Sequence, residues 1–187
     1  HTADERRDPR VFNVAFVGRM SRQKRPDAFI LVAKAMKQAA PGQYHFIMHG
    51  SGDMDSFTDG LIKRYGLDDV IERRPMSIPV SRTYADADVL LVSSVNEGIT
   101  LTTAISAGIP VLSANVGSQE TLVPSQGLLR RMTSSFIHDA KRALMHLNGN
   151  EMDRHKLWEV EKNRLETFSH KQTANSLFCQ LLNEWNK

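Results

Sequence analysis

The chain has 187 residues, of which 41% are hydrophobic and 24% charged, a composition typical of one globular domain with a buried core. The formal net charge is +3 and the basic residues are scattered, so nucleic acid is not expected as a partner, while peripheral contact with a membrane stays an alternative. The single cysteine excludes an internal disulfide and fits a cytoplasmic protein. No apolar run approaches the roughly 20 residues that span a bilayer.

Apolar runs alternate with helical patterns along the first half of the chain. Residues 11–18 and 43–50 are β-branched and aromatic runs that end in glycine, which predicts two buried strands. Between them, residues 25–42 carry apolar side chains at helical spacing, with Pro26 in the first turn. A second helix is expected over 53–65.

The alternation continues to about residue 117, and only helical patterns follow from about residue 133. In chain order we expect a third strand at 70–76, a helix at 79–87, a fourth strand at 88–94, a helix at 101–108, a fifth strand at 109–117, and helices at 134–147, 151–166 and 171–185.

Strands of continuous apolar residues that alternate with helices predict an α/β fold, a Rossmann-like parallel sheet covered by helices on both faces, with further C-terminal helices. We interpret residues 1–10 as a linker or tail, 11–169 as the Rossmann-like domain and 170–187 as a separate C-terminal helix. Ligands of such sheets bind at the carboxyl ends of the strands, so the loops after the strands are the candidate sites.

The loop after the first strand carries two cations. Gly18 permits a tight turn, and Arg19 and Lys24 stand near the start of the next helix. Cations beside a helix N-terminus make an anion site, most naturally for phosphate. Surface charges that merely prefer loops are an equally weighted alternative.

The loop after the second strand is rich in glycine. Gly50 and Gly52 flank Ser51, so that the backbone can approach a ligand closely. His49, at the end of this strand, is interpreted as a structural histidine in preference to a catalytic one.

An acid and a glycine follow the fourth strand. Glu97 is expected at the carboxyl edge of the sheet, and Gly98 lets the amides of Ile99, Thr100 and Leu101 point outward at the start of a helix. Such amides bind phosphate, and a carboxylate beside them suits sugar hydroxyls or a cationic reaction centre. The alternative is an acid that only favours a helix N-terminus.

Four segments in this order, "FVGRMSRQKRPD", "HGSGDM", "ADADVLLVSS" and "NEGITLTTAISAGIPVLSANVGSQETL", together resemble the C-terminal, donor-binding domain of the group 1 retaining glycosyltransferases of GT-B architecture. The resemblance covers residues 12–147. It implies that the chain binds a nucleoside-diphosphate sugar as substrate, with no cofactor and no metal, for transfer that retains the anomeric configuration.

The resemblance also implies roles for single residues. Arg19 and Lys24 match the pair that holds the donor diphosphate, Glu97 matches the acid that contacts the donor sugar, and the amides of residues 98–101 match the phosphate-binding amides. The nucleotide base matches the region of Met76 more loosely. The catalytic residues predicted in this way are Glu97, Arg19 and Lys24, and the substrate-binding residues are Gly18, Gly50, Met76, Gly98, Ile99, Thr100 and Leu101.

The sequence departs from the family pattern at one point. The family carries a second glutamate that binds the ribose, but the matching positions here are Thr103 or Ile105, and the segment is two residues shorter. The chain truly lacks the pair, or a gap in the sequence between Thr103 and Ala104 hides it, or the register of the match is shifted. We favour a gap, because the removal of two residues from a helix rotates the rest of that helix by about 200°. A coherent apolar stripe through the helix as written argues against a gap.

In the family an acceptor-binding domain precedes the donor domain, and the helix at 171–185, with Leu181 and Trp185, is expected to pack on that domain. A second interpretation is a non-catalytic, degenerate donor domain that acts as a partner or sensor subunit. A third, an unrelated nicotinamide-dependent oxidoreductase, lacks a G-x-G-x-x-G segment after the first strand.

Overall fold

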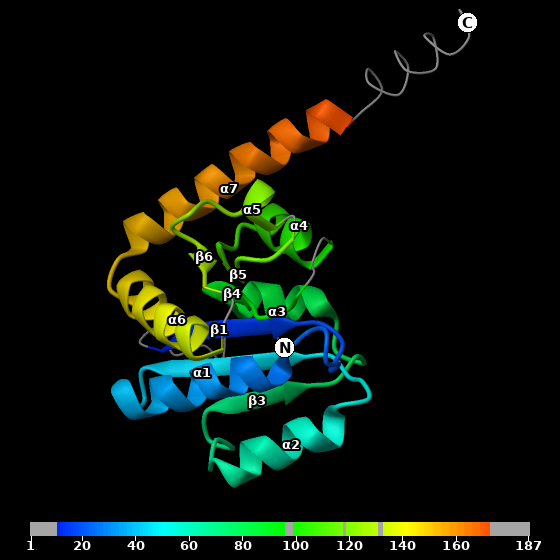
Figure 1. Ribbon diagram of the computed structural model, residues 1–187, viewed down its shortest axis with the longest axis vertical. Helices are drawn as coiled ribbons and strands as arrows, with labels where there is room; N and C mark the ends of the chain where they lie inside the picture. The colour runs from blue at the N-terminus through cyan, green and yellow to red at the C-terminus, as the bar shows by residue number, and fades with distance from the viewer. Residues whose placement is uncertain (1–10, 96–98, 118, 131–132, 173–187) are drawn as a thin grey trace, which may run out of the picture.

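The computed structural model describes residues 11–95, 99–117, 119–130 and 133–172. These residues form one six-stranded sheet in which every neighbouring pair is parallel, in the order β3-β2-β1-β4-β5-β6 (Figure 1). The strands are β1 (Phe12–Val17), β2 (Tyr44–His49), β3 (Ile71–Arg74), β4 (Val89–Val92), β5 (Val111–Ala114) and β6 (Leu128–Leu129).

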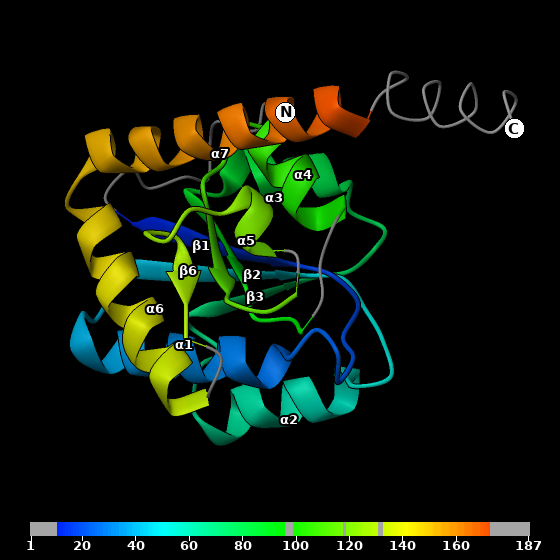
Figure 2. The ribbon, with the colours of Figure 1, turned by 45° about the horizontal axis from the view of Figure 1, so that its top comes forward.

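Helices cover both faces of the sheet. α1, α2 and α6 lie on one face and α3, α4 and α5 on the other, while α7 packs against α4, α5 and α6 (Figure 2). The helices are α1 (Pro26–Ala39), α2 (Asp55–Arg64), α3 (Val80–Asp86), α4 (Ile99–Ser106), α5 (Gln119–Leu122), α6 (Thr133–Asn148) and α7 (Glu151–Gln172). The predicted α/β, Rossmann-like fold is therefore confirmed.

The larger core forms between the sheet and α1. The Phe29 ring on α1 lies 5.4 Å from the ring of Phe16 on β1 and 5.5 Å from that of Phe46 on β2, measured between centroids. All three side chains are buried, and aromatic pairs at this spacing add to the hydrophobic free energy of burial. This packing fixes the β1–α1–β2 unit, and with it the place where the loop after β1 leaves the sheet.

Two expectations about the elements are wrong. β6 was not predicted, because its two residues are too short to show a pattern; it forms where the amides of Ser113 and Asn115 donate to the carbonyls of Gly127 and Leu129. The sequence predicted two helices, at 151–166 and 171–185, with a break between them. The structure shows one helix, α7, that continues across the expected break as far as Gln172.

Other expectations lie outside the described residues: the tail at 1–10, and Leu181 and Trp185 in the last predicted helix. Of the helices that the structure describes, none combines the length and the apolar character needed to cross a bilayer.

Three polar side chains at three-residue spacing hold α7 against the domain. Trp158 Nε1 donates to the carbonyl of Ile105 at 2.8 Å, and Arg164 donates to the carbonyl of Val123 at 3.0 Å. Between them, Glu161 accepts from the amide of Val111 at 3.0 Å. Glu161 is fully buried, and this burial raises the pKa of its carboxyl to about 9.

We predict that Glu161→Gln removes a pH-dependent part of the stability. Between the ordinary carboxyl pKa of 4.5 and about 9, the folded state binds a proton that the unfolded chain has released. The stability from this group is therefore complete below the lower value and is lost as the pH rises towards the higher one, by at most about 1.4 kcal/mol per pH unit.

Glutamine keeps the shape and cannot ionise. Urea unfolding from about pH 5 to about pH 8 should show the free energy of unfolding of the wild type falling relative to that of the variant. Parallel pH profiles for the two proteins would contradict the assignment of a buried neutral acid.

Candidate functional site

The loops after β1 and β2 run side by side beyond the carboxyl edge of the sheet. The amide of Gly18 donates to the carbonyl of His49 at 3.0 Å, and that of Met20 donates to the carbonyl of Ser51 at 3.2 Å. The amide of Gly50 donates in turn to the carbonyl of Arg74 at 3.0 Å, which extends the contact to the end of β3. The ends of three strands are thus joined by backbone hydrogen bonds.

Glycine is required where these two loops meet. Gly50 has a φ of +127°, and a Cβ atom on it would collide with the carbonyl oxygen of Gly18. A Cβ atom on Gly52 would stand 2.8 Å from the amide nitrogen of Met20. The sequence suggested that these glycines let a ligand approach; in the structure the neighbour that approaches them is the loop after β1.

The first loop places Lys24 over Gly18. The Lys24 Cδ atom lies 3.7 Å from the position that a Cβ atom of Gly18 would take, so the aliphatic stem of the lysine crosses the glycine. Arg25 then turns the chain into α1 with a left-handed φ of 54°, and its guanidinium is held by the carboxylate of Asp27 at 3.0 Å. Arg19 is exposed in the same loop, so both predicted cations stand at the carboxyl edge before α1.

The end of β4 is fastened to this loop. The buried Ser93 hydroxyl lies 3.0 Å from the carbonyl of Lys24 and 2.9 Å from that of Arg25, and the amide of Val95 donates to the carbonyl of Gln23 at 3.0 Å. The segment that leads towards residues 96–98 therefore starts beside Lys24. Glu97 and Gly98 themselves lie outside the described residues.

α4 begins directly after these residues. Ile99 is 84% exposed, Thr100 is half-buried and Leu101 is buried in the core, so the predicted phosphate-binding amides belong to the first turn of this helix. A helix leaves the amides of its first turn without partners inside the helix, which suits an anion.

The helix is continuous where the second family glutamate is expected. The amide of Ala107 donates to the carbonyl of Thr103 at 2.9 Å, and that of Ile109 donates to the carbonyl of Ala104 at 3.0 Å. Leu101, Ala104 and Ile105 are all buried, as the apolar stripe predicted. Neither Thr103 nor Ile105 supplies the second acid in this helix. The gap between Thr103 and Ala104 stays a prediction.

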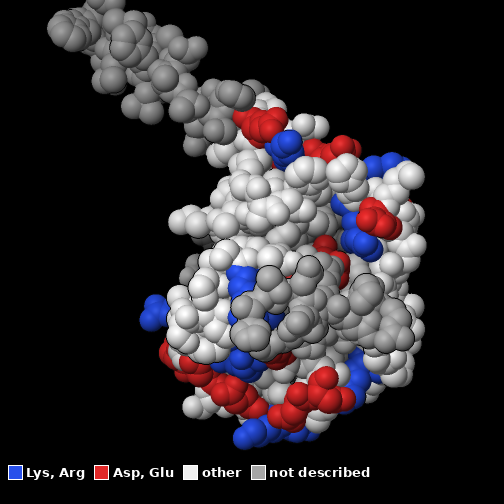
Figure 3. Space-filling view, turned by 180° about the vertical axis from the view of Figure 1, so that it is seen from behind, with Lys and Arg blue, Asp and Glu red and all other residues white. Residues whose placement is uncertain are grey.

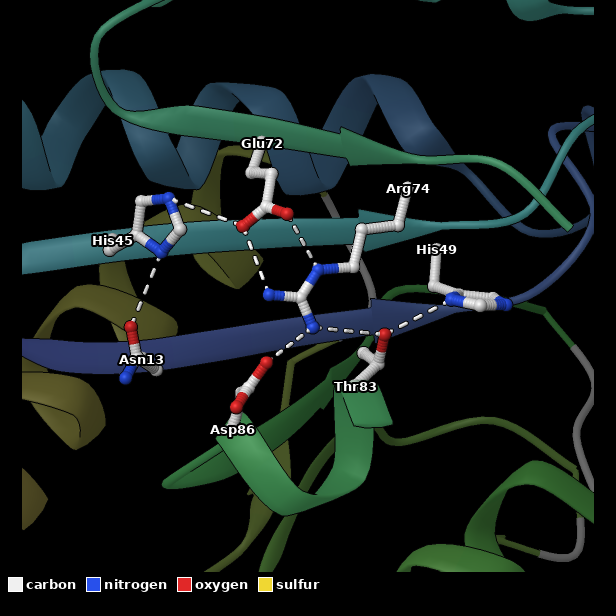
Figure 4. A network of polar contacts seen from close by, with 7 residues as sticks. All are labelled: Asn13, His45, His49, Glu72, Arg74, Thr83 and Asp86. Atoms are coloured by element: carbon white, nitrogen blue, oxygen red, sulfur yellow. Dashed lines mark hydrogen bonds and ion pairs between the residues drawn. The ribbon is translucent and has the colours of Figure 1, made fainter. Parts of the chain in front are cut away.

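The remaining predicted residue, Met76, follows β3 and is 69% exposed. Before it stands Arg74, a buried arginine that sequence reasoning missed, since no local pattern marks an arginine in a strand for burial. Its guanidinium contacts the carboxylates of Glu72 and Asp86, each at 2.7 Å, and the hydroxyl of Thr83 at 3.3 Å (Figure 4). The hydrogen bond from Arg74 lowers the pKa of Glu72 below its ordinary value.

The described charged side chains form no single basic surface on the face drawn in Figure 3. On the face drawn in Figure 3, Lys and Arg are interspersed with Asp and Glu. Within the described ranges, no group of three or more His, Cys, Asp or Glu side chains is arranged to hold a metal ion. A hollow elsewhere, between α6, α7 and the loop after α5, is lined by none of the predicted site residues.

The fold and this edge define a Rossmann-like domain whose loops converge at the carboxyl ends of its central strands. Residues 11–145 match the family model "Glycosyl transferases group 1", and the chain belongs to that family.

Two curated relatives are D-inositol 3-phosphate glycosyltransferases. That of Paenarthrobacter aurescens (strain TC1) is 25% identical over 89% of this chain and 42% of its own length. That of Segniliparus rotundus is 29% identical over 64% of this chain and 28% of its own length. The chain thus spans less than half of the curated relatives that it matches.

Solved structures show the same fold at low sequence identity. TarM superposes with a TM-score of 0.80 at 17% identity, over 95% of this chain and 36% of that chain. The catalytic domain of the cholesterol-α-glucosyltransferase from Helicobacter pylori superposes with a TM-score of 0.69 at 17% identity, over 84% of this chain and 98% of that chain.

We predict that Gly50→Ala separates the two loops and destabilises the domain. The added methyl group meets the Gly18 carbonyl oxygen and the backbone is left-handed, so urea unfolding should show a loss of at least about 1–3 kcal/mol.

Gly60→Ala is the matched control, because Gly60 lies within α2 with no atom inside 4 Å of an added Cβ atom. It should stabilise the protein by about 0.5–1 kcal/mol. Equal effects of the two substitutions would contradict the close contact of the loops.

Proposed function

We propose that this chain binds the nucleoside-diphosphate sugar donor of a metal-independent glycosyl transfer that retains the anomeric configuration. The observation that carries the proposal is the convergence of three loops at one edge: Lys24 crosses Gly18, the loop at Gly50 packs against the same glycine, and Ser93 fastens the end of β4 beside them. Membership of the group 1 family supports the reaction class.

The chemistry gives each group a role in this proposal. As the sugar leaves the nucleoside diphosphate, negative charge grows on the diphosphate and positive charge on the sugar ring. Arg19, Lys24 and the amides of residues 98–101 stabilise the negative charge, so that no divalent cation is needed there. Glu97 faces the sugar and stabilises the positive charge on its ring.

The acceptor is assigned to a domain outside this chain. The partial coverage of the relatives supports this assignment, since the chain matches 42% and 28% of the two curated glycosyltransferases. We propose that the 187-residue chain binds a nucleotide sugar weakly and transfers the sugar poorly. Transfer by this chain at the rate of a protein that also contains the acceptor domain would contradict this division of labour.

We predict that Lys24→Ala weakens donor binding about tenfold or more, because a hydrogen bond to a charged group contributes about 1.5–3 kcal/mol. Isothermal titration with UDP-, GDP- and ADP-sugars, and with NAD as the comparison, identifies the donor that binds and then measures the loss. Arg22→Ala is the matched control, since Arg22 is an exposed cation in the same loop. An equal loss in both variants, or preferential binding of NAD, would refute the proposed site.

The sequence of α4 favours one second candidate, a non-catalytic donor domain, because neither Thr103 nor Ile105 is acidic. Release of the nucleoside diphosphate from the bound sugar distinguishes the two. The rates are compared in a protein that also contains the acceptor domain. If the site is catalytic, the wild type releases the nucleoside diphosphate faster than Glu97→Gln does; equal rates indicate a module that only binds.

A further inference from the structure

His49 lies at the end of β2, between the predicted diphosphate site after β1 and the predicted base site after β3. It closes β2, which lies in the sheet between β1, with the cationic loop after it, and β3, with Met76 after it. Its side chain is 3% exposed and faces α3, where Thr83 is also buried. A histidine at this place can meet a ligand that spans from the loop after β1 to the loop after β3.

Thr83 contacts one of the two ring nitrogens of His49. The Thr83 hydroxyl lies 3.3 Å from Arg74 Nη1 and 3.0 Å from His49 Nδ1. Since a guanidinium can only donate, the hydroxyl accepts from Arg74. A hydroxyl has one proton and two acceptor positions, so it can donate that proton to Nδ1 or accept a second hydrogen bond from it. In the first arrangement the neutral ring carries its hydrogen on Nε2, which leaves Nε2–H to donate to a ligand.

The surroundings keep the ring uncharged. Burial first, and then the positive charge of Arg74, lower the pKa of His49 below its ordinary value. The other charged or titratable groups of this network are Glu72, Asp86 and His45, and both carboxylates are engaged by Arg74. His49 thus presents a neutral N–H near pH 7.

Nε2 points away from the network. In Figure 4 the ring directs Nδ1 at Thr83 and Nε2 onward, past the end of β2. Within the ranges that the structure describes, Nε2 has no hydrogen-bond partner, whereas Nδ1 does.

We propose that His49 is a donor-binding residue whose Nε2–H donates to an uncharged oxygen of the nucleoside half of the donor, on the ribose or the base, and that Thr83 is its positioning residue. The proposal deepens the proposed function and rests on it. A neutral N–H suits an uncharged oxygen, whereas the cations Arg19 and Lys24 after β1 suit the diphosphate.

Isothermal titration with UDP, GDP, ADP and pyrophosphate tests this binding role. His49→Phe should weaken the affinity for the nucleoside diphosphate that binds tightest about three- to tenfold, which corresponds to the loss of one neutral hydrogen bond. The affinity for pyrophosphate should not change. His49→Gln keeps an N–H donor and should restore most of the affinity. His45→Phe, four residues earlier on the same face of β2, is the matched control and should bind like the wild type.

The outcomes separate the two proposals. A wild type that binds none of the four probes overturns the proposed function, and this inference with it. A wild type that binds a nucleoside diphosphate, with an equal affinity in His49→Phe or an equal loss for pyrophosphate, overturns the inference alone.

A second measurement does not depend on a substitution at His49. The ¹⁵N spectrum of the wild-type imidazole should show the neutral Nε2–H tautomer, and the Nε2 signal should shift when the nucleoside diphosphate is added. Thr83→Val should lose the single tautomer and bind the nucleoside diphosphate more weakly, with pyrophosphate unaffected. An Nδ1–H tautomer, or an Nε2 signal that does not respond to the ligand, would overturn the assignment.

Discussion

The contact between the backbones of Gly18 and Gly50 is the constraint on which the rest of the edge depends. The carbonyl of Gly18 occupies the space that any side chain at residue 50 would need, so the loops after β1 and β2 can lie in contact only with glycine there. The Lys24 stem then crosses Gly18, and Ser93 reaches the carbonyls of Lys24 and Arg25. The places of the lysine and of the segment after β4 follow from this one close approach.

Two arginines that end or follow strands of the sheet, Arg74 and Arg19, lie in different environments. Arg74 is buried, and the carboxylates of Glu72 and Asp86 neutralise it, so its charge is used to join β3 to α3. Arg19 is exposed at the carboxyl edge. A diphosphate can approach an exposed cation such as Arg19 without displacing a buried ion pair. For this reason we place the anion in the loop after β1 and not beside Arg74.

Much of this arrangement could be predicted from the sequence, because it depends on local patterns. Continuous apolar runs such as that of β4 show a strand buried on both faces, and glycine at position 18 or 50 shows where a strand turns. The network around Arg74 could not be predicted, since it joins residues of β2, β3 and α3 that no spacing relates. The role of Gly50 could be predicted only in part. The sequence indicates that another group approaches this glycine closely, but not that this group is the backbone of the loop after β1.

The central claim is that the loops after β1, β2 and β4 form one donor site. Mapping amide chemical shifts on titration with the nucleoside-diphosphate sugar that binds tests it most directly. The account predicts the largest changes at residues 18–24 and 50–52 and in the first turn of α4. Changes confined to the hollow between α6 and α7, around His146, Lys156 and Arg164, with the carboxyl edge unperturbed, would contradict it.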